Sequence, residues 1–147
     1  MNKNKIISLI VFLFLLFSLA SCRVKTSYAY MQDAQNITEA YIVSLYFEED
    51  YDICTTTIKQ IEDIDTFLQD FDDLDCYKYY GDPKGFGEHN IDDPAIKLVY
   101  SNGDYELIGW NGIAKYTTSD DRLRNYRGYR VFDEISFKEF AQKYSNL

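Results

Sequence analysis

Residues 95–118 read AIKLVYSNGDYELIGWNGIAKYTT and decide the fold of this 147-residue chain. Within them, two apolar runs at 95–100 and 105–110 flank an Asn-Gly pair. Asn-Gly between apolar runs is the strongest short-range signal for a β-hairpin, because a type I′ turn needs positive φ at both central residues. A second pair, Asn111-Gly112, predicts another hairpin with 113–118 as the returning strand; the alternative is one continuous strand at this point.

Further strands are expected on both sides of this stretch. Residues 41–47 and 51–58 are rich in β-branched and aromatic side chains and are separated by an acidic turn, which is typical of a hairpin. After a turn at 119–121 we expect one long strand over 122–132, and 76–80 is a candidate for a short strand. Hairpin connections therefore dominate the predicted sheet.

Two segments have helical periodicity instead. The first has apolar residues at three- and four-residue intervals, which places them on one face of a helix. They are Ile61, Ile64, Phe67, Leu68, Phe71 and Leu74. The second begins with a capping-box pattern at Ser136, followed by an apolar face. That face consists of Phe137, Phe140, Ala141 and Tyr144. The element order β-β-α-β-β-β-β-α predicts an α+β fold, with a mainly antiparallel sheet and two amphipathic helices packed on it.

The N-terminus has the three parts of a secretory signal: two early lysines, an apolar run at 6–20 and small residues before Cys22. The apolar run is shorter than the roughly 20 residues of a membrane-spanning helix. The stretch Leu19-Ala20-Ser21-Cys22 resembles the lipobox of bacterial lipoproteins at all four positions. This resemblance implies diacylglyceryl transfer to the Cys22 sulfur and cleavage before Cys22. The alternatives are an uncleaved anchor and a plain secretory signal with an unmodified cysteine.

The resemblance implies a signal peptide at 1–21. The residues from Arg23 to about Asn36 are polar or small and have no clear period, so we expect a tether at 22–37 and a single α+β domain at 38–147. Two acyl chains hold a protein on a bilayer stably, whereas one chain binds reversibly. The expected location is the extracytoplasmic face of the cell membrane, with the membrane as a partner through Cys22. The rest of the chain looks broadly like the small lipoproteins of low-GC monoderm bacteria, and this likeness implies no activity.

The charge narrows the classes of partner. Residues 1–21 hold two of the 15 basic and none of the 24 acidic residues, so their removal changes the formal charge from −9 to −11. Such a surface repels nucleic acid, and no nucleic-acid partner is expected. A cationic protein fits this charge, although the same composition also suits any soluble domain.

The candidate binding site is the stretch 122–130, where four arginines fall within nine positions. Strand alternation would place Arg122, Arg124, Tyr126 and Arg130 on one face of the strand expected at 122–132. Arginine and tyrosine together suit an anionic ligand, such as a phosphate-bearing wall polymer. The alternatives are that these arginines pair with the acidic helix of the same domain or guard a sheet edge.

Two cysteines remain beside the lipidation site. A disulfide between Cys54 and Cys76 would close a loop of about 22 residues and stabilise the fold by about 3 kcal/mol in the chain-entropy model. Export from the cytoplasm permits such a bridge. The alternative is that either cysteine is a small buried apolar residue.

The remaining polar groups do not form a recognisable catalytic or metal set. His89 is the only histidine and lies in the irregular stretch 81–94, without the spacing that metal sites need. Residues 81–87 of this stretch are a candidate binding loop. The aspartates over 63–75 have helical spacing, so their side chains would splay around the axis rather than converge on a cation. We expect no metal, no cofactor and no enzymatic activity.

The leading hypothesis is a membrane-anchored, non-catalytic binding or interaction module of unknown ligand. One alternative is an inhibitor or immunity lipoprotein that neutralises a cationic hydrolase or bacteriocin, because an acidic surface steers basic partners. Another alternative is a small envelope enzyme that uses Glu88, His89 and the adjacent aspartates.

Overall fold

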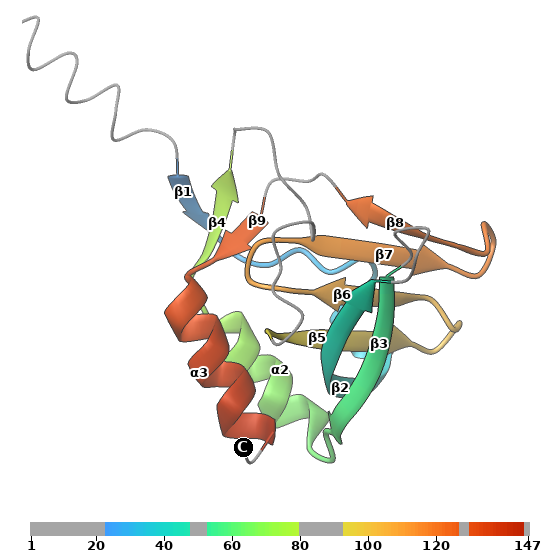
Figure 1. The fold of residues 1–147 in the computed structure, drawn as a ribbon, viewed down its shortest axis with the longest axis horizontal. Helices are drawn as coiled ribbons and strands as arrows, with labels where there is room; N and C mark the ends of the chain where they lie inside the picture. Colours follow the sequence, from blue (N-terminus) through green and yellow to red (C-terminus); the bar gives the residue numbers. More distant parts are fainter. Residues whose placement is uncertain (1–22, 48–52, 80–92, 127–129, 146–147) are drawn as a thin grey trace, which may run out of the picture.

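The computed structural model describes residues 23–47, 53–79, 93–126 and 130–145. Its main element is a six-stranded antiparallel sheet with the strand order β3-β2-β5-β6-β7-β8 (Figure 1). The strands are β2 (Ile37–Phe47), β3 (Ile53–Gln60), β5 (Pro94–Tyr100), β6 (Tyr105–Ile108), β7 (Ile113–Thr117) and β8 (Arg122–Tyr126).

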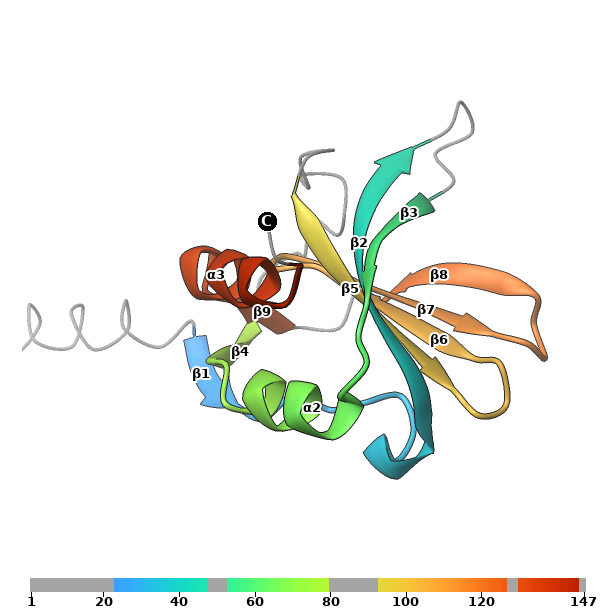
Figure 2. The same cartoon turned by 90° about the horizontal axis from the view of Figure 1, so that it is seen from below.

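A second antiparallel sheet has the order β1-β4-β9 and is built from three segments that are distant in sequence. Its strands are β1 (Arg23–Thr26), β4 (Cys76–Tyr79) and β9 (Arg130–Phe132). The helices α2 (Ile64–Asp72) and α3 (Glu134–Ser145) lie on one side of the six-stranded sheet (Figure 2). A short 3-10 helix, η1 (Ala34–Asn36), precedes β2.

This arrangement confirms the α+β class, the antiparallel sheet and the two packed helices. The predicted apolar face of the first helix is inside the protein, because Phe67 and Phe71 are fully buried and its other members pack against the same core. In α3, Phe137 and Ala141 are likewise fully buried. Residues 76–79 form the short strand, and Asn111-Gly112 belongs to a turn between β6 and β7, closed by a 2.8 Å hydrogen bond from the Gly109 N–H to the Gly112 carbonyl.

The hairpin between β5 and β6 has a different turn from the one expected. Only Gly103 in it has positive φ, at 87°, so the turn is not type I′. The N–H of Gly103 donates to the carbonyl of Tyr100, and the N–H of Tyr100 donates to the carbonyl of Asp104. This pattern is that of a three-residue loop with glycine in the left-handed position. The strand pairing is nevertheless the one predicted.

The expected tether is wrong, because described residues between 23 and 37 belong to the fold. Arg23–Thr26 form β1, and the side chains of Tyr28 and Ile37 are buried in the main core. The tyrosine ring packs edge-on against Phe71 with ring centroids 5.3 Å apart. The described domain therefore begins at residue 23, and Cys22 itself lies outside the described residues.

The long strand expected at 122–132 is also wrong. Residues Arg122–Tyr126 pair with β7 in the large sheet, whereas Arg130–Phe132 pair with β4 in the small sheet. The small sheet is anchored to the large one by its last residue, because the N–H of Phe132 donates to the carbonyl of Trp110 at 2.8 Å. The burial of Phe132 in the main core explains why the chain leaves the large sheet.

The core has two parts, one on each face of the large sheet. The larger lies between the sheet and the helices, and tilted aromatic pairs connect α2 with α3, among them Phe67 with Phe140 at 5.1 Å. The smaller consists of Val43, Leu45, Ala95, Leu107 and Ala114 on the other face. Within the described part of the chain, no helix is long and apolar enough to cross a membrane.

Candidate functional site

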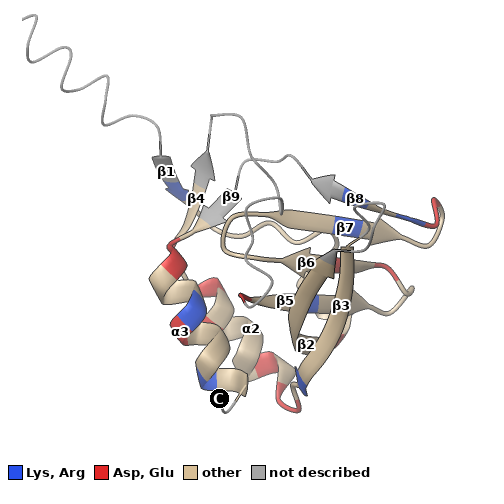
Figure 3. Cartoon of the chain, in the orientation of Figure 1, with Lys and Arg blue, Asp and Glu red and all other residues tan. Residues whose placement is uncertain are grey.

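The residues predicted as a binding face are divided between two sheets. Arg122 and Arg124 are exposed on β8, and Tyr126 ends that strand, but Arg130 begins β9 in the small sheet. Figure 3 shows the basic residues of β8 next to the acidic β7–β8 turn. There, Arg124 Nη2 lies 3.0 Å from Asp120 Oδ2. The predicted four-residue face is therefore not formed, and one of its arginines pairs within its own hairpin.

The possible disulfide between Cys54 and Cys76 is not formed. Cys54 lies on β3 of the large sheet and is half-buried, whereas Cys76 lies on β4 of the small sheet and is fully buried. The two thiols belong to different sheets, and Cys76 is part of the main core. The alternative of a small buried apolar residue describes Cys76.

The other sequence candidates do not converge. His89 and the stretch 81–92 lie outside the described residues. Asp93, the adjacent aspartate that is described, is buried, accepts a hydrogen bond from Trp110 Nε1 at 3.1 Å and lies 2.7 Å from Lys138 Nζ. Among the described residues, no group of three or more His, Cys, Asp or Glu side chains is arranged to hold a metal ion.

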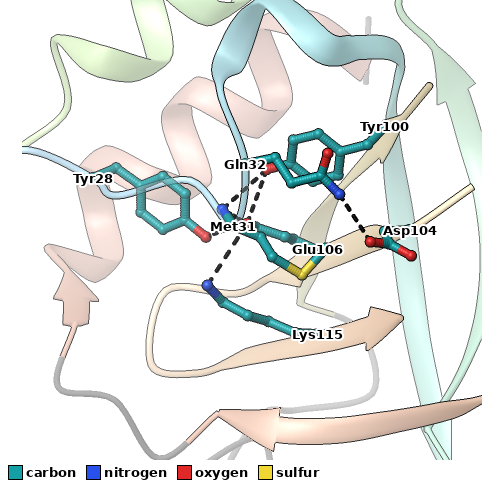
Figure 4. A network of polar contacts seen from close by, with 7 residues as sticks. All are labelled: Tyr28, Met31, Gln32, Tyr100, Asp104, Glu106 and Lys115. Atoms are coloured by element: carbon teal, nitrogen blue, oxygen red, sulfur yellow. Dashed lines mark hydrogen bonds and ion pairs between the residues drawn. The ribbon is translucent and has the colours of Figure 1, made fainter. Parts of the chain in front are cut away.

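The structure instead reveals a polar site where residues 28–32, here called the strap, cross the large sheet. Two acidic residues meet the strap: Glu106 on β6, on the face that meets the helices, and Asp104, which directly precedes β6. Glu106 is completely buried and Asp104 is 8% exposed. Figure 4 shows strap residues and neighbouring strand residues converging on these two carboxyl groups.

Glu106 is the centre of this site. Its Oε2 accepts a hydrogen bond from the Tyr28 hydroxyl, and its Oε1 accepts from the Met31 N–H and, at 2.9 Å, from the Tyr100 hydroxyl. Lys115 Nζ on β7 lies 3.8 Å from Oε1. Four groups from three segments thus satisfy one buried carboxyl group, as burial of a polar group requires.

Asp104 holds the far end of the strap. Its carboxylate accepts hydrogen bonds from Gln32 Nε2 and Asn102 Nδ2, both at 2.8 Å, and from the N–H and hydroxyl of Thr118 at 2.8 and 3.0 Å. These donors, the Thr118 backbone N–H first, hold the pKa of Asp104 below its ordinary value. The ionised form is therefore the one that the fold stabilises.

The tyrosines of the site stay protonated. Burial raises the pKa of the Tyr100 hydroxyl, and the adjacent Glu106 carboxyl group adds to this effect. Burial likewise raises the pKa of Tyr30, whose hydroxyl donates to Asp72 Oδ1 of α2 at 2.6 Å. Both hydroxyls therefore act as hydrogen-bond donors.

Through these hydrogen bonds, Glu106 and Asp104 attach the strap to the large sheet. The oxygens of Glu106 accept hydrogen bonds from Tyr28, Met31 and Tyr100, and the first two of these contacts come from the strap. Sequence reasoning missed it, although one signal was available: Glu106 and Ile108 alternate on a central strand, so a charged residue stands at a core-facing position.

Comparisons with protein-family models, with curated proteins and with solved structures found no match to this chain.

Proposed function

We propose that this chain is a bacterial lipoprotein whose acylated Cys22 holds a non-catalytic binding domain on the extracytoplasmic face of the cell membrane. What supports the proposal is the lipobox-like stretch Leu19-Ala20-Ser21-Cys22 behind an apolar run, and a described fold whose residues all follow that cysteine. Cleavage before Cys22 would thus leave every described strand and helix intact.

The attachment site at Glu106 supports the same proposal. A lipid on Cys22 acts on the domain only through the residues that follow it, and these are β1 and the strap. The strap is held by Glu106 of the central strand β6 and by Asp104 directly before that strand, so the anchor would be joined to the middle of the large sheet.

The decisive experiment is the intact mass of the protein isolated from membranes of a bacterium that expresses the full chain. We expect loss of residues 1–21 and the added mass of a diacylglyceryl group. Cys22→Ser should retain the leader and lack the lipid, whereas the control Cys54→Ser should be processed normally. An unmodified Cys22 in a chain that retains Met1 would refute the proposal.

A second candidate function, neutralising a cationic protein, has one observation in its favour. Residues 61–75 around α2 contain seven acidic and no basic side chains, and Glu62, Asp65 and Asp73 are exposed. An acidic surface steers a basic partner, so binding should weaken as salt rises. Binding of a basic hydrolase that is lost in Glu62→Gln/Asp65→Asn and at high salt would support this role; salt-independent binding would exclude it.

A further inference from the structure

The large sheet has two edge strands, β3 and β8, and they are protected to different degrees. Among the described strands, β3 pairs only with β2, and β8 pairs only with β7 (Figure 1). The free side of an edge strand presents backbone N–H and C=O groups to which a further strand can bind. Charged side chains, proline and β-bulges are the usual features that prevent such binding.

The edge at β8 is protected by charge. Its Arg122 and Arg124 side chains are exposed, and Arg124 forms an ion pair with Asp120 of the preceding turn. If two copies of β8 paired with each other, arginines of the two chains would lie side by side, and like charges that face each other across strands are destabilising. Association of two copies through this edge is therefore disfavoured.

The edge at β3 is protected at one end only. Thr57 and Lys59 pair with consecutive residues of β2, so Ile58 between them is the extra residue of a β-bulge. The bulge and the charge of Lys59 protect the end of β3 that leads to α2. The rest of the strand, residues 53–57, contains no charged residue, no proline and no glycine.

The unprotected stretch 53–57 suits pairing with a second copy of itself. In an antiparallel pair centred on its middle residue, Thr55 lies opposite Thr55 of the second copy. Cys54 then lies opposite Thr56, and Ile53 lies opposite Thr57. No position brings like charges together, and β-branched side chains both favour strands and interact across them. Because both copies use the same surface, the contact closes as a two-fold symmetric dimer.

The side chains along this stretch are accessible to a second copy. Thr56 and Thr57 are exposed, and Thr55 is half-buried. Among the described residues, three large apolar side chains are exposed, and two of them belong to the β2–β3 hairpin. These two are Tyr46, which is 38% exposed, and Ile58, which is 39% exposed and directly follows the stretch. The hairpin thus exposes apolar surface beside its free edge.

We propose that two copies of this protein pair through β3, antiparallel and centred on Thr55, so that their two large sheets become one continuous sheet. The backbone groups on the free side of 53–57 then find partners without a change in the fold of either copy. The proposal needs only the described edge strand, so it goes beyond the lipoprotein assignment and does not depend on it.

The test is disulfide trapping of the full chain as isolated from an expressing bacterium, with Cys54→Ser as the parent. Residues directly opposite each other in antiparallel strands have Cα atoms about 4.5–5.5 Å apart, a separation that a disulfide spans. Added to this parent, Thr55→Cys should therefore form a covalent dimer under mild oxidation. Any dimer that the parent itself forms is subtracted.

Thr57→Cys in the same parent is the matched control. In the proposed register the two copies of this residue are offset by about four residues, roughly 13 Å along the strands, which a disulfide does not span. Thr57 is more exposed than Thr55, so random collisions would favour the control. We expect about tenfold more covalent dimer with Thr55→Cys, because only these thiols meet.

A second pair of variants tests the edge by charge. Thr56→Lys places on the free stretch the kind of residue that protects other edge strands. Added to Thr55→Cys, it should lower the yield of covalent dimer about tenfold, because symmetry brings the unfavourable charge into the contact twice. Gln142→Lys adds the same charge at an exposed position of α3 and should leave the yield unchanged.

The proposal is overturned if Thr55→Cys forms no covalent dimer, as when the free edge binds a strand of another protein instead. It is also overturned if Thr55→Cys and Thr57→Cys give equal yields, or if Thr56→Lys and Gln142→Lys lower the yield equally. Far-UV circular dichroism reports whether each variant is folded; if Thr56→Lys is not, the comparison of the two cysteine positions still decides.

Discussion

At the scale of single residues, the fold depends on the carboxyl group of Glu106, which solvent does not reach. Removing it in Glu106→Ala leaves the Tyr28 and Tyr100 hydroxyls and the Met31 N–H without their acceptor. Each buried donor left unsatisfied costs about 1–3 kcal/mol, so we expect the free energy of unfolding to fall by at least about 3 kcal/mol.

Glu106→Gln is the matched control. Its carbonyl oxygen can still accept from Met31 and Tyr100, and its amide can donate to the Tyr28 oxygen, so the expected loss is about 1 kcal/mol. Urea unfolding followed by far-UV circular dichroism measures both variants. Equal losses in the two would mean that the hydrogen bonds of this carboxyl group are not what holds the strap.

Asp104 makes stability depend on pH. Its pKa is lower in the folded protein than the ordinary value of 3.8, because Thr118 and its other donors favour the ionised form. The unfolded chain therefore takes up the proton first as pH falls, and acid favours unfolding below pH 3.8. We expect Asp104→Asn to be less stable than the wild type at neutral pH, with a difference that shrinks below pH 3.8. A difference that does not change with pH would contradict this role of the carboxylate.

Residue types alone could not reveal this site. The sequence pattern identified the buried faces of the helices, because their spacing is periodic, but Glu106 is bound by residues 75 and 78 positions away. Such partners are found only when the register of the sheet and the path of the strap are known. The arginines at 122–130 were grouped by strand alternation, and that rule fails where the chain passes from one sheet to another.

At the scale of elements, two residues are candidates for the N-cap of α3, Ser136 and Asp133. The sequence pattern favours Ser136, but the structure places the cap three residues earlier, where Asp133 Oδ2 accepts from the Ser136 N–H at 3.0 Å and from its hydroxyl at 2.9 Å. We expect Asp133→Ala to lower the free energy of unfolding by about 1 kcal/mol, as loss of an N-cap does. Ser136→Ala should cost less, because the Ser136 N–H keeps its acceptor; thermal unfolding of both compares them, and a larger loss in Ser136→Ala would favour the cap expected from the sequence.

Element boundaries were predicted less well than element types. Both helices begin in the same way. An aspartate accepts a hydrogen bond from the backbone N–H three residues later, at 133–136 in one helix and at 63–66 in the other. A capping-box motif starting at serine is therefore a weaker guide here than the aspartate three residues before it. The turn at 101–103 also differs from the predicted type, although it joins the same two strands in the predicted antiparallel order.

At the scale of the whole molecule, the domain boundary is the largest departure from expectation. A chain that starts at Thr38 lacks β1 and the buried Tyr28, and it exposes the groups that the strap covers. We expect it to be less stable than a chain that starts at Arg23 by at least about 3 kcal/mol, from the lost ring burial and the unsatisfied Glu106. Chemical denaturation of the two chains measures this difference. Equal stability would mean that residues 23–37 are a tether and not part of the folded domain. The polar, aperiodic composition of residues 23–36 predicts a tether, but neither property reports contacts with distant strands.

If the domain is anchored through Cys22 as proposed, a force that pulls it away from the bilayer reaches β1 before the other described strands. This strand is four residues long and lies at the edge of its sheet, so it should detach under a small load. The load then reaches Tyr28 and Met31. Their hydrogen bonds to Glu106 should keep the large sheet folded after β1 has detached. Single-molecule stretching between residues 22 and 147 should therefore show one unfolding event at low force, when β1 detaches, and a second at higher force that is absent in Glu106→Ala. The small sheet could then open under load while the large sheet stays folded.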